Sequence, residues 1–236
     1  MTPNLKEIKN IAVDWLRSPA VPCDADVSLP GMIQHPFFDF VFLCDEKGPF
    51  DMRKEPERLE TVLKARERKI NQQKTVCGIL ALMRKAYRIY FLKEIYELEI
   101  ADEKTCGNAL GEIWAMLENN DSTDEETKSL MLTWLLNADK NVIMNKDDLL
   151  VYNSLPDKIT IYRGIQPNES AKGFSWSLSV DTAAWFAQRF EPKGGVYSLT
   201  VNKKHVIAYI NTRNEKEIIV DYTKIKEPKR VSNLAL

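Results

Sequence analysis

Three short groups of polar residues in the last third of the chain have side chains suited to chemistry. The first, Tyr162-Arg163-Gly164, ends a segment in which apolar and polar residues alternate as in a β-strand. An arginine there offers a planar, charged fork that matches a pyrophosphate, and the glycine after it lets the backbone approach a ligand closely. The alternative is that Arg163 closes the strand with a structural ion pair.

The second group is a run of alternating serines, Ser175, Ser177 and Ser179. In an extended segment these hydroxyls lie on one side and can donate and accept hydrogen bonds toward a common point. The alternative is a serine-rich strand end that leads into a helix capped by Ser179 or Asp181. For Ser179 we favour the capping role.

The third group is a pair of carboxylates, Glu215 and Glu217, which stand two residues apart at the start of an apolar strand. That spacing predicts that both side chains point to the same side. Carboxylates held together beside apolar residues cost free energy unless a ligand or a cation uses them. A solvated edge strand is one alternative interpretation. The other is that Glu215 merely pairs with a neighbour such as Lys216 or Arg213, a surface contact worth about 0–1 kcal/mol.

The order of these groups resembles the catalytic series of the mono-ADP-ribosyltransferases, in the subclass with an Arg-Ser-Glu motif. Arg163, Ser175-Trp176-Ser177 and Glu215-Lys216-Glu217 follow one another in the family's order. The segment 174–187 is similar to that family's F-S-T-S-L segment and the helix after it, with Trp176 where many members carry Thr. The resemblance covers roughly residues 149–220. The short spacing between Arg163 and Ser175 is typical of a compact, toxin-like bacterial or phage member.

The resemblance implies a split β-sandwich fold in which NAD, as the substrate, binds in a cleft between two small sheets. It implies that Glu217 stabilises the oxocarbenium ion formed when nicotinamide leaves C1′ of the ribose, much as in glycoside cleavage. Ser175 would orient Glu217, and Glu215 would position the acceptor. The residues that it assigns to cofactor binding are Arg163 on a phosphate, Gly164 on the nicotinamide amide, and Ser175 and Ser177.

The resulting hypothesis is an NAD-dependent mono-ADP-ribosyltransferase, a glycosyltransferase that moves ADP-ribose to a protein acceptor and releases nicotinamide. In the family, a Glu two residues before the catalytic Glu goes with arginine acceptors. Two alternatives stay open. One is ADP-ribosylation of nucleic acid, because residues 156–236 hold 13 Lys/Arg and 8 Asp/Glu, a net charge of +5. The other is a non-catalytic interaction protein with a degenerate NAD cleft.

The elements that must position these residues change character at Pro156. Before it, helical periodicity predicts helices over about 56–100, 106–118, from a capping box at Ser122-x-x-Glu125 through Leu135, and from Asn145 to Pro156. After it, strands are predicted at 158–163, 174–177, 196–201, 206–210 and 217–220, with one helix over 181–190 that buries Ala183, Phe186, Ala187 and Phe190. Helices followed by strands predict an α+β fold, with about two-thirds of the chain helical.

Two regions follow from this organisation. We expect residues 1–100 to form a mainly helical extension of unknown role, and prolines to break its first fifty residues into short pieces. The apolar stretch 36–44 reads as a buried strand or a turn-rich packing segment. We expect residues 101–236 to form the catalytic domain, with helices over 101–155 and the β region over 156–236, because 80 residues alone would make a thin domain around a nucleotide cleft.

The composition excludes several classes of protein. Of 236 residues, 44% are hydrophobic and 28% charged, which is typical of a globular protein. No apolar run is long enough to cross a bilayer, so we expect no membrane partner, and the start of the chain lacks the apolar core of a secretory signal. Four cysteines without a C-x-x-C motif and two histidines predict neither a metal site nor a disulfide framework. We therefore expect a cytoplasmic protein, in the host cytoplasm if a phage encodes it.

Overall fold

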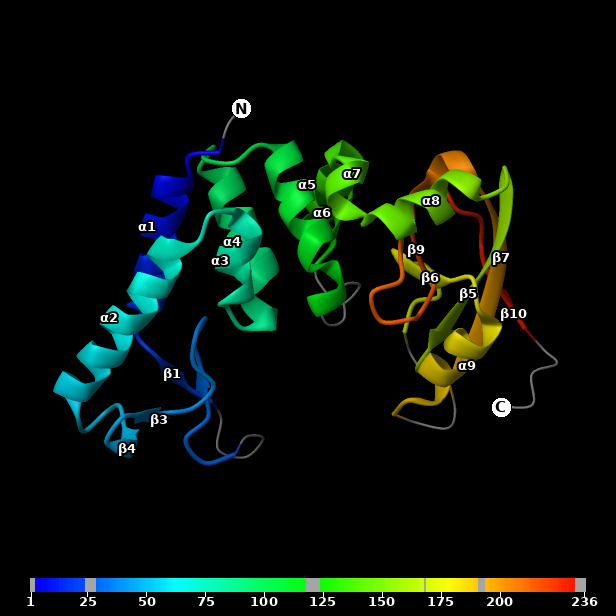
Figure 1. Cartoon of the computed structure of the whole chain (residues 1–236). Helices are drawn as coiled ribbons and strands as arrows, with labels where there is room; N and C mark the ends of the chain where they lie inside the picture. The colour runs from blue at the N-terminus through cyan, green and yellow to red at the C-terminus, as the bar shows by residue number, and fades with distance from the viewer. Residues whose placement is uncertain (1–2, 24–28, 118–123, 168, 191–193, 232–236) are drawn as a thin grey trace. The chain divides into compact units, whose positions relative to one another are not determined.

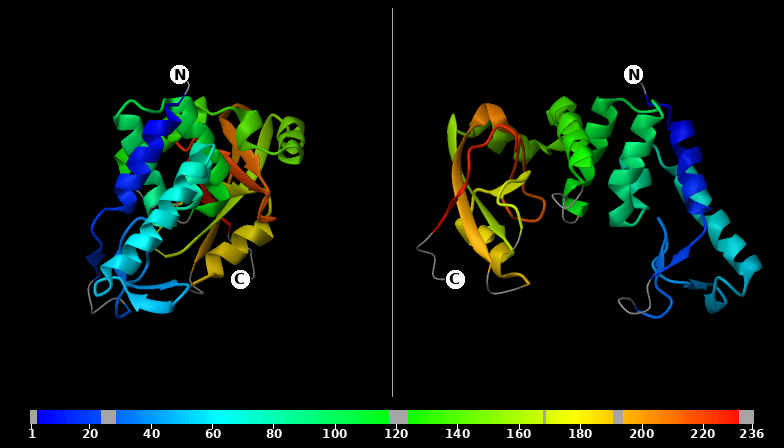
Figure 2. Two further views of the ribbon diagram at one scale, coloured as in Figure 1. Left: turned by 60° about the vertical axis from the view of Figure 1, so that its left-hand side comes forward. Right: turned by 180° about the vertical axis from the view of Figure 1, so that it is seen from behind.

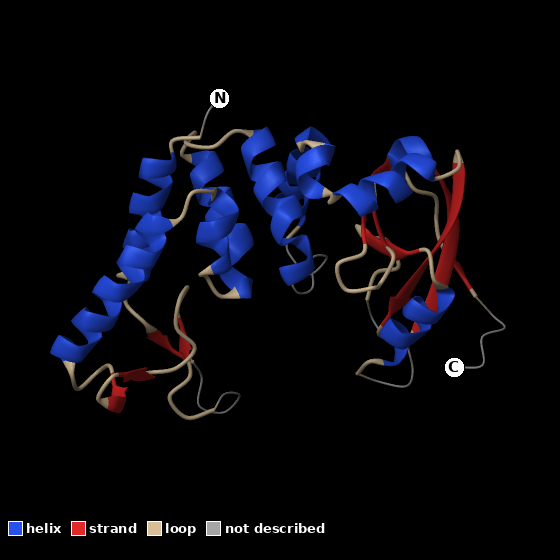
Figure 3. Ribbon diagram, in the orientation of Figure 1, coloured by secondary structure: helices blue, strands red, loops and turns tan. Residues whose placement is uncertain are grey.

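The computed structural model describes residues 3–23, 29–117, 124–167, 169–190 and 194–231 (Figure 1). Helices make up 47% of the chain and strands 21%. Helices dominate early and strands late, as Figure 3 shows. The mixed helical and antiparallel class is confirmed, although the helical share is smaller than the two-thirds expected.

The chain divides into two compact units, unit 1 (Met1–Ala109) and unit 2 (Leu110–Leu236). The division lies inside α5 (Glu103–Ile113), a few residues beyond the boundary predicted after residue 100. Each unit has its own buried apolar residues, so each is described by itself.

Unit 1 begins with a helix that the sequence analysis missed. α1 (Leu5–Leu16) buries Ile8, Ala12 and Leu16, which recur every four residues. The Asn4 side chain accepts a hydrogen bond from the first turn and caps the helix. The prediction of short pieces is wrong here because the prolines from position 19 onward follow the helix and do not interrupt it.

The stretch predicted as helical over 56–100 is divided into α2, α3 and α4. Pro56 stands at the start of α2, where its missing amide hydrogen costs nothing, and Thr75 caps α3. Phe37 and Phe38 are buried ahead of β3, so the apolar stretch there is mostly a packing segment. The elements after α1 are β1 (Val21–Pro22) paired with β2 (Ile33–Gln34), β3 (Phe42–Asp45) paired with β4 (Gly48–Asp51), α2 (Pro56–Gln72), α3 (Val76–Ala81) and α4 (Lys85–Glu97).

The helices of unit 2 precede its sheet. The predicted helix over 106–118 ends earlier, because α5 gives way to a short 3₁₀ turn, η1 (Trp114–Met116). Ser122 of the predicted capping box lies outside the described residues, and Asp124 caps the next helix. Asn145 caps the last one, as predicted. These helices are α6 (Glu125–Asn137), α7 (Lys140–Ile143) and α8 (Lys146–Ser154).

A six-stranded antiparallel sheet, in the order β10-β7-β5-β6-β9-β8, forms the rest of unit 2. Tyr162 on β5 lies opposite Ser177 on β6, and Ser177 lies opposite Glu217 on β9. The three polar groups found in the sequence therefore lie on three neighbouring strands. The strands are β5 (Lys158–Ile165), β6 (Ser175–Ser177), β7 (Gly195–Asn202), β8 (Val206–Ile210), preceded by the turn η2 (Lys203–His205), β9 (Glu217–Val220) and β10 (Lys229–Arg230).

Helix α9 (Val180–Gln188) packs across β5 and β7 (Figure 2). Its cap is Ser179, as favoured above, and the alternative cap Asp181 is wrong because that residue already belongs to the first turn. Ala183 and Ala187 are buried as predicted. Phe190 is 75% exposed and not part of the buried face, because the helix ends at Gln188, before it could continue that face.

Candidate functional site

The candidate site is centred on Glu217, the first residue of β9. Only 5% of this residue is exposed. Its Oε1 accepts a hydrogen bond from Ser175 Oγ at 2.5 Å and a second from Trp114 Nε1 at 2.8 Å. Two neutral donors therefore fix a buried carboxylate in one orientation.

Arg163 joins this group through the backbone of β6. Its Nη1 donates to the carbonyl oxygen of Ser175 at 2.7 Å, and the side chain is half-buried. Ser175 thus contacts Arg163 through its carbonyl and Glu217 through its hydroxyl. The structure brings together the three residues that define the Arg-Ser-Glu pattern, and it contains the hydrogen bond expected between Ser175 and Glu217.

Trp114 is the residue of this site that the sequence analysis did not single out. Its indole is 1% exposed and packs edge to face against Phe174, with ring centroids 5.9 Å apart. Phe174 in turn packs edge to face against Tyr222 at 4.8 Å. These rings surround the buried carboxylate with apolar surface. A tryptophan at the end of a predicted helix was the only signal in the sequence, and it does not distinguish a core residue from a donor.

Glu215 lies in the turn before β9. Ser177 Oγ donates to its carbonyl at 2.7 Å and accepts from the Ser179 amide at 2.9 Å. Lys216, between the two glutamates, has a φ of 47°, a left-handed conformation that costs a non-glycine residue roughly 1 kcal/mol. Ser177 therefore holds a strained turn in place, and its predicted contact with a cofactor stays a prediction.

Arg213 approaches both carboxylates. Its Nη2 lies 2.9 Å from Glu215 Oε2 and 4.0 Å from Glu217 Oε2. The two carboxylates therefore face the same guanidinium, as the predicted common side requires. The reason is the turn rather than strand alternation, because β9 begins only at Glu217. A solvated edge is wrong for Glu217, which is buried, on a strand that lies between β6 and β8. The alternative that Glu215 pairs with Arg213 is confirmed by their ion pair.

Gly164 has a structural explanation. A Cβ at this position would lie 1.8 Å from the Ala183 carbonyl oxygen and 2.6 Å from the Ala187 amide nitrogen. The glycine therefore allows α9 to pack directly on β5. A backbone contact of Gly164 with nicotinamide stays a prediction, and the packing of α9 accounts for the residue without it.

The electrostatics of the site are governed by burial. Desolvation raises the pKa of Glu217 above its ordinary value, while the hydrogen bonds from Ser175 and Trp114 and the charge of Arg213 oppose the rise. The hydrogen bonds and the charge of Arg213 therefore do not offset the cost of burying the negative charge of Glu217. A cation placed beside it would lower its pKa and gain a strong interaction in a medium of low polarity.

No protein-family model matches the chain, and no curated protein or solved structure matches it significantly. No helix in the described ranges is both long and apolar enough to cross a membrane. Among the residues placed in the structure, no group of three or more His, Cys, Asp and Glu side chains could hold a metal ion. The functional conclusion below therefore depends on the geometry around Glu217.

Proposed function

We propose that the chain is an NAD-dependent mono-ADP-ribosyltransferase that modifies arginine on a protein acceptor, with a fold of the split β-sandwich kind and an NAD cleft bordered by Arg163, Ser175 and Glu217. The observation that carries the proposal is the buried Glu217 carboxylate, held by Ser175 and Trp114 and linked through Ser175 to Arg163. A buried carboxylate held by two neutral donors, with its nearest cation 4.0 Å away, is suited to a substrate that develops positive charge.

In the proposed reaction the bond between ribose C1′ and the nicotinamide nitrogen breaks, and its electron pair leaves with nicotinamide. The C1′ centre becomes oxocarbenium-like, and Glu217 stabilises that charge. The nicotinamide ring of NAD is itself cationic, so substrate binding offsets the burial that raises the pKa of Glu217 and keeps the carboxylate ionised.

The acceptor then supplies the new bond to C1′. A guanidinium nitrogen forms the N–C1′ bond and gives up one proton, which Glu215 accepts. The contact between Arg213 and Glu215 supports an arginine acceptor, because it is a guanidinium bound by Glu215 with a nitrogen 4.0 Å from Glu217. An acceptor arginine in the same position would reach C1′ beside Glu217.

The anionic part of NAD needs a partner of opposite charge. Arg163 offers it, because its guanidinium is always charged and its Nη1 contacts the Ser175 carbonyl, which places that charge beside the residue that binds Glu217. Ser175 would then transmit the position of the bound phosphate to Glu217 through the two hydrogen bonds it makes. In this proposal Ser175 is a positioning residue and Glu217 the catalytic one.

Nucleic acid is the second candidate acceptor, and one observation favours it. Trp185 is 56% exposed, and Arg189 lies over its ring at 5.3 Å and over the Phe190 ring at 5.0 Å. Exposed aromatic rings combined with arginine are typical of surfaces that stack unpaired bases. Labelled NAD offered to a lysate treated with nuclease or with protease separates the two acceptors.

The proposal is tested by nicotinamide release from NAD. Purified full-length chain is expected to release nicotinamide and to transfer label from NAD to an arginine-containing acceptor. The variant Glu217→Gln should lose this activity, whereas Glu227→Gln, a change at an exposed glutamate, should keep it. Absence of nicotinamide release by the folded wild-type chain, with and without acceptor, would overturn the proposal and favour a non-catalytic interaction protein.

A further inference from the structure

Unit 1 contains a cavity of about 640 Å³ between the β3–β4 hairpin and α2. This volume lies within the range of small-molecule sites, roughly 300–1,000 Å³. Apolar side chains from three parts of unit 1 line its interior: Phe37, Val62, Ala65, Ile70 and Leu82. Nothing in the proposed function uses this cavity.

The charged residues that line the cavity are mostly basic. Its walls carry the cations Lys47, Arg58, Arg66, Arg68 and Lys69 against the two acids Asp45 and Glu46. Five positive and two negative side chains leave an excess of three positive charges. An excess of this kind in a concave, partly open site attracts a multiply charged anion.

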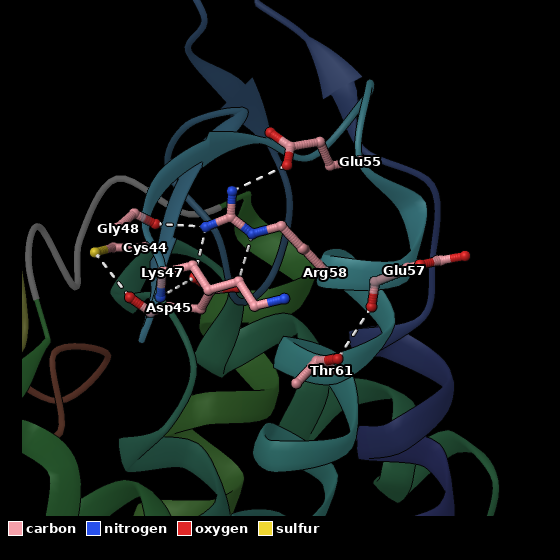
Figure 4. A network of polar contacts seen from close by, with 8 residues as sticks. All are labelled: Cys44, Asp45, Lys47, Gly48, Glu55, Glu57, Arg58 and Thr61. Atoms are coloured by element: carbon pink, nitrogen blue, oxygen red, sulfur yellow. Dashed lines mark hydrogen bonds and ion pairs between the residues drawn. The ribbon is translucent and has the colours of Figure 1, made fainter.

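Of the two acids that line the cavity, Asp45 is bound tightly by Arg58 (Figure 4). Arg58 Nε donates to Asp45 Oδ2 at 2.8 Å, and Nη2 donates to Asp45 Oδ1 at 2.5 Å and to the Gly48 carbonyl at 2.7 Å. Its remaining nitrogen, Nη1, donates to Glu55 at 2.9 Å. Arg58 therefore fixes the hairpin to α2 and forms one wall of the cavity, and Asp45 is not free to balance the other cations.

Those other cations lack counter-charges. Within the described part of the chain, Lys47, Arg66, Arg68 and Lys69 form no ion pair within 4.0 Å. Arg66 is half-buried, stacks on the Phe38 ring at 4.5 Å and donates to the Phe37 carbonyl at 3.1 Å. Burial lowers the pKa of its guanidinium, and the charge of Asp39 opposes that shift.

We propose that this cavity binds a polyanion with a flat apolar body, of the size and chemistry of a nucleoside diphosphate. The phosphates would lie against Arg66, Arg68 and Lys69 on α2 and Lys47 on the hairpin, and the base against the apolar interior. A guanidinium already stacked on Phe38 is preorganised for a phosphate, because its fork is fixed before the ligand arrives. The proposal is independent of the activity assigned to unit 2.

The test measures binding of ADP, inorganic pyrophosphate and adenosine to the full chain by titration calorimetry. We expect ADP to bind most tightly, pyrophosphate more weakly, and ADP binding to weaken as salt rises. The double variant Arg68→Gln/Lys69→Gln should weaken ADP binding about tenfold, because it removes two positive charges at exposed positions without touching the core.

Two controls separate this site from others. Lys64→Gln/Lys74→Gln makes the same charge change near the cavity at residues that do not line it, and it should leave ADP affinity within about twofold. Arg163→Gln, which removes the proposed phosphate contact in unit 2, should leave this binding in place. The proposal is overturned by wild-type chain that does not bind ADP, by equal affinity in both double variants, by loss of binding in Arg163→Gln alone, or by adenosine that binds as tightly as ADP.

Discussion

Arg58 in unit 1 and Glu217 in unit 2 are each the centre of a polar network, and the two networks treat charge in opposite ways. Arg58 meets two carboxylates directly, and its hydrogen bonds lower the pKa of Asp45 to about 2. Glu217 is buried with two neutral donors, its nearest guanidinium nitrogen is 4.0 Å away, and its pKa is raised.

This difference indicates that the Arg58 network stabilises the fold, whereas the Glu217 network is suited to catalysis. In the Arg58 network each charge has its partner, so the network stabilises the hairpin on α2 and has nothing left to bind a ligand. In the Glu217 network a buried carboxylate is oriented by neutral donors and its nearest cation is 4.0 Å away, which costs folding stability and suits a cationic transition state. A substitution at Glu217 should therefore lower activity and raise stability, whereas a substitution at Arg58 should lower stability.

The largest effect on activity is expected at Glu217. Glu217→Gln should lower nicotinamide release at least about 100-fold, because an amide offers no negative charge to C1′. The same variant should be more stable by about 1 kcal/mol, or about 2–4 °C in thermal unfolding, because the amide oxygen still accepts from Ser175 and Trp114 without burying a charge. Activity within a factor of about two of wild type, or a large loss of stability, would contradict the comparison.

The second effect distinguishes transfer from hydrolysis. Glu215→Gln should reduce labelling of arginine acceptors by about tenfold or more while slow hydrolysis of NAD continues, because Glu215 contacts a guanidinium and not the ribose. Folding should be unaffected, since the Arg213 partner is 43% exposed and such pairs contribute about 0–1 kcal/mol. Nicotinamide release and acceptor labelling are measured in the same sample. Equal loss of nicotinamide release and acceptor labelling, or no loss of either, would exclude the acceptor role of Glu215.

A third variant sharpens the account of the neutral donors. Trp114→Phe keeps a ring against Phe174 but removes the hydrogen bond to Glu217. Turnover should fall about tenfold, and the acid limb of the pH–rate profile should move to higher pH, because a donor that lowers the pKa of Glu217 is lost. Trp15→Phe, which removes an indole hydrogen bond to Glu94 in unit 1, is the control. An unmoved limb would mean that Trp114 acts through packing alone.

The smallest effect is expected at Arg58, where the substitution changes stability. The pKa of Asp45 falls from 3.8 to about 2 on folding, so its contribution to stability is present above pH 4 and is lost as the pH falls toward 2. Arg58→Gln should lower the unfolding temperature at pH 7 and reduce its dependence on pH in that window. Thermal unfolding at several pH values compares this variant with Lys64→Gln as the control. Parallel curves for wild type and Arg58→Gln would refute the pairing.

Part of this picture was predictable because it depends on neighbours in sequence. The limits of β8 and β9 match the predicted strands, since each is a short apolar run with polar flanks. The caps at Asn145 and Ser179 also follow from local rules. The prediction failed at α1, where two local signals differ. The prolines from position 19 onward indicate short pieces, whereas the four-residue spacing of apolar residues before them indicates a helix.

By itself the sequence determined which polar side chains the sheet carries, since the placement of Arg163, Ser175 and Glu217 in or beside strands can be predicted from residue type and spacing. Only the tertiary structure decided the state of Glu217. Its two donors come from residues 42 and 103 positions away in the chain, and its raised pKa comes from burial that no local pattern encodes. The cavity of unit 1 is likewise a feature of the tertiary structure, because the β3–β4 hairpin, tied to α2 by Arg58, forms one of its walls. Hydrogen-bond capacity is a property of each residue, whereas desolvation is a property of everything packed around it.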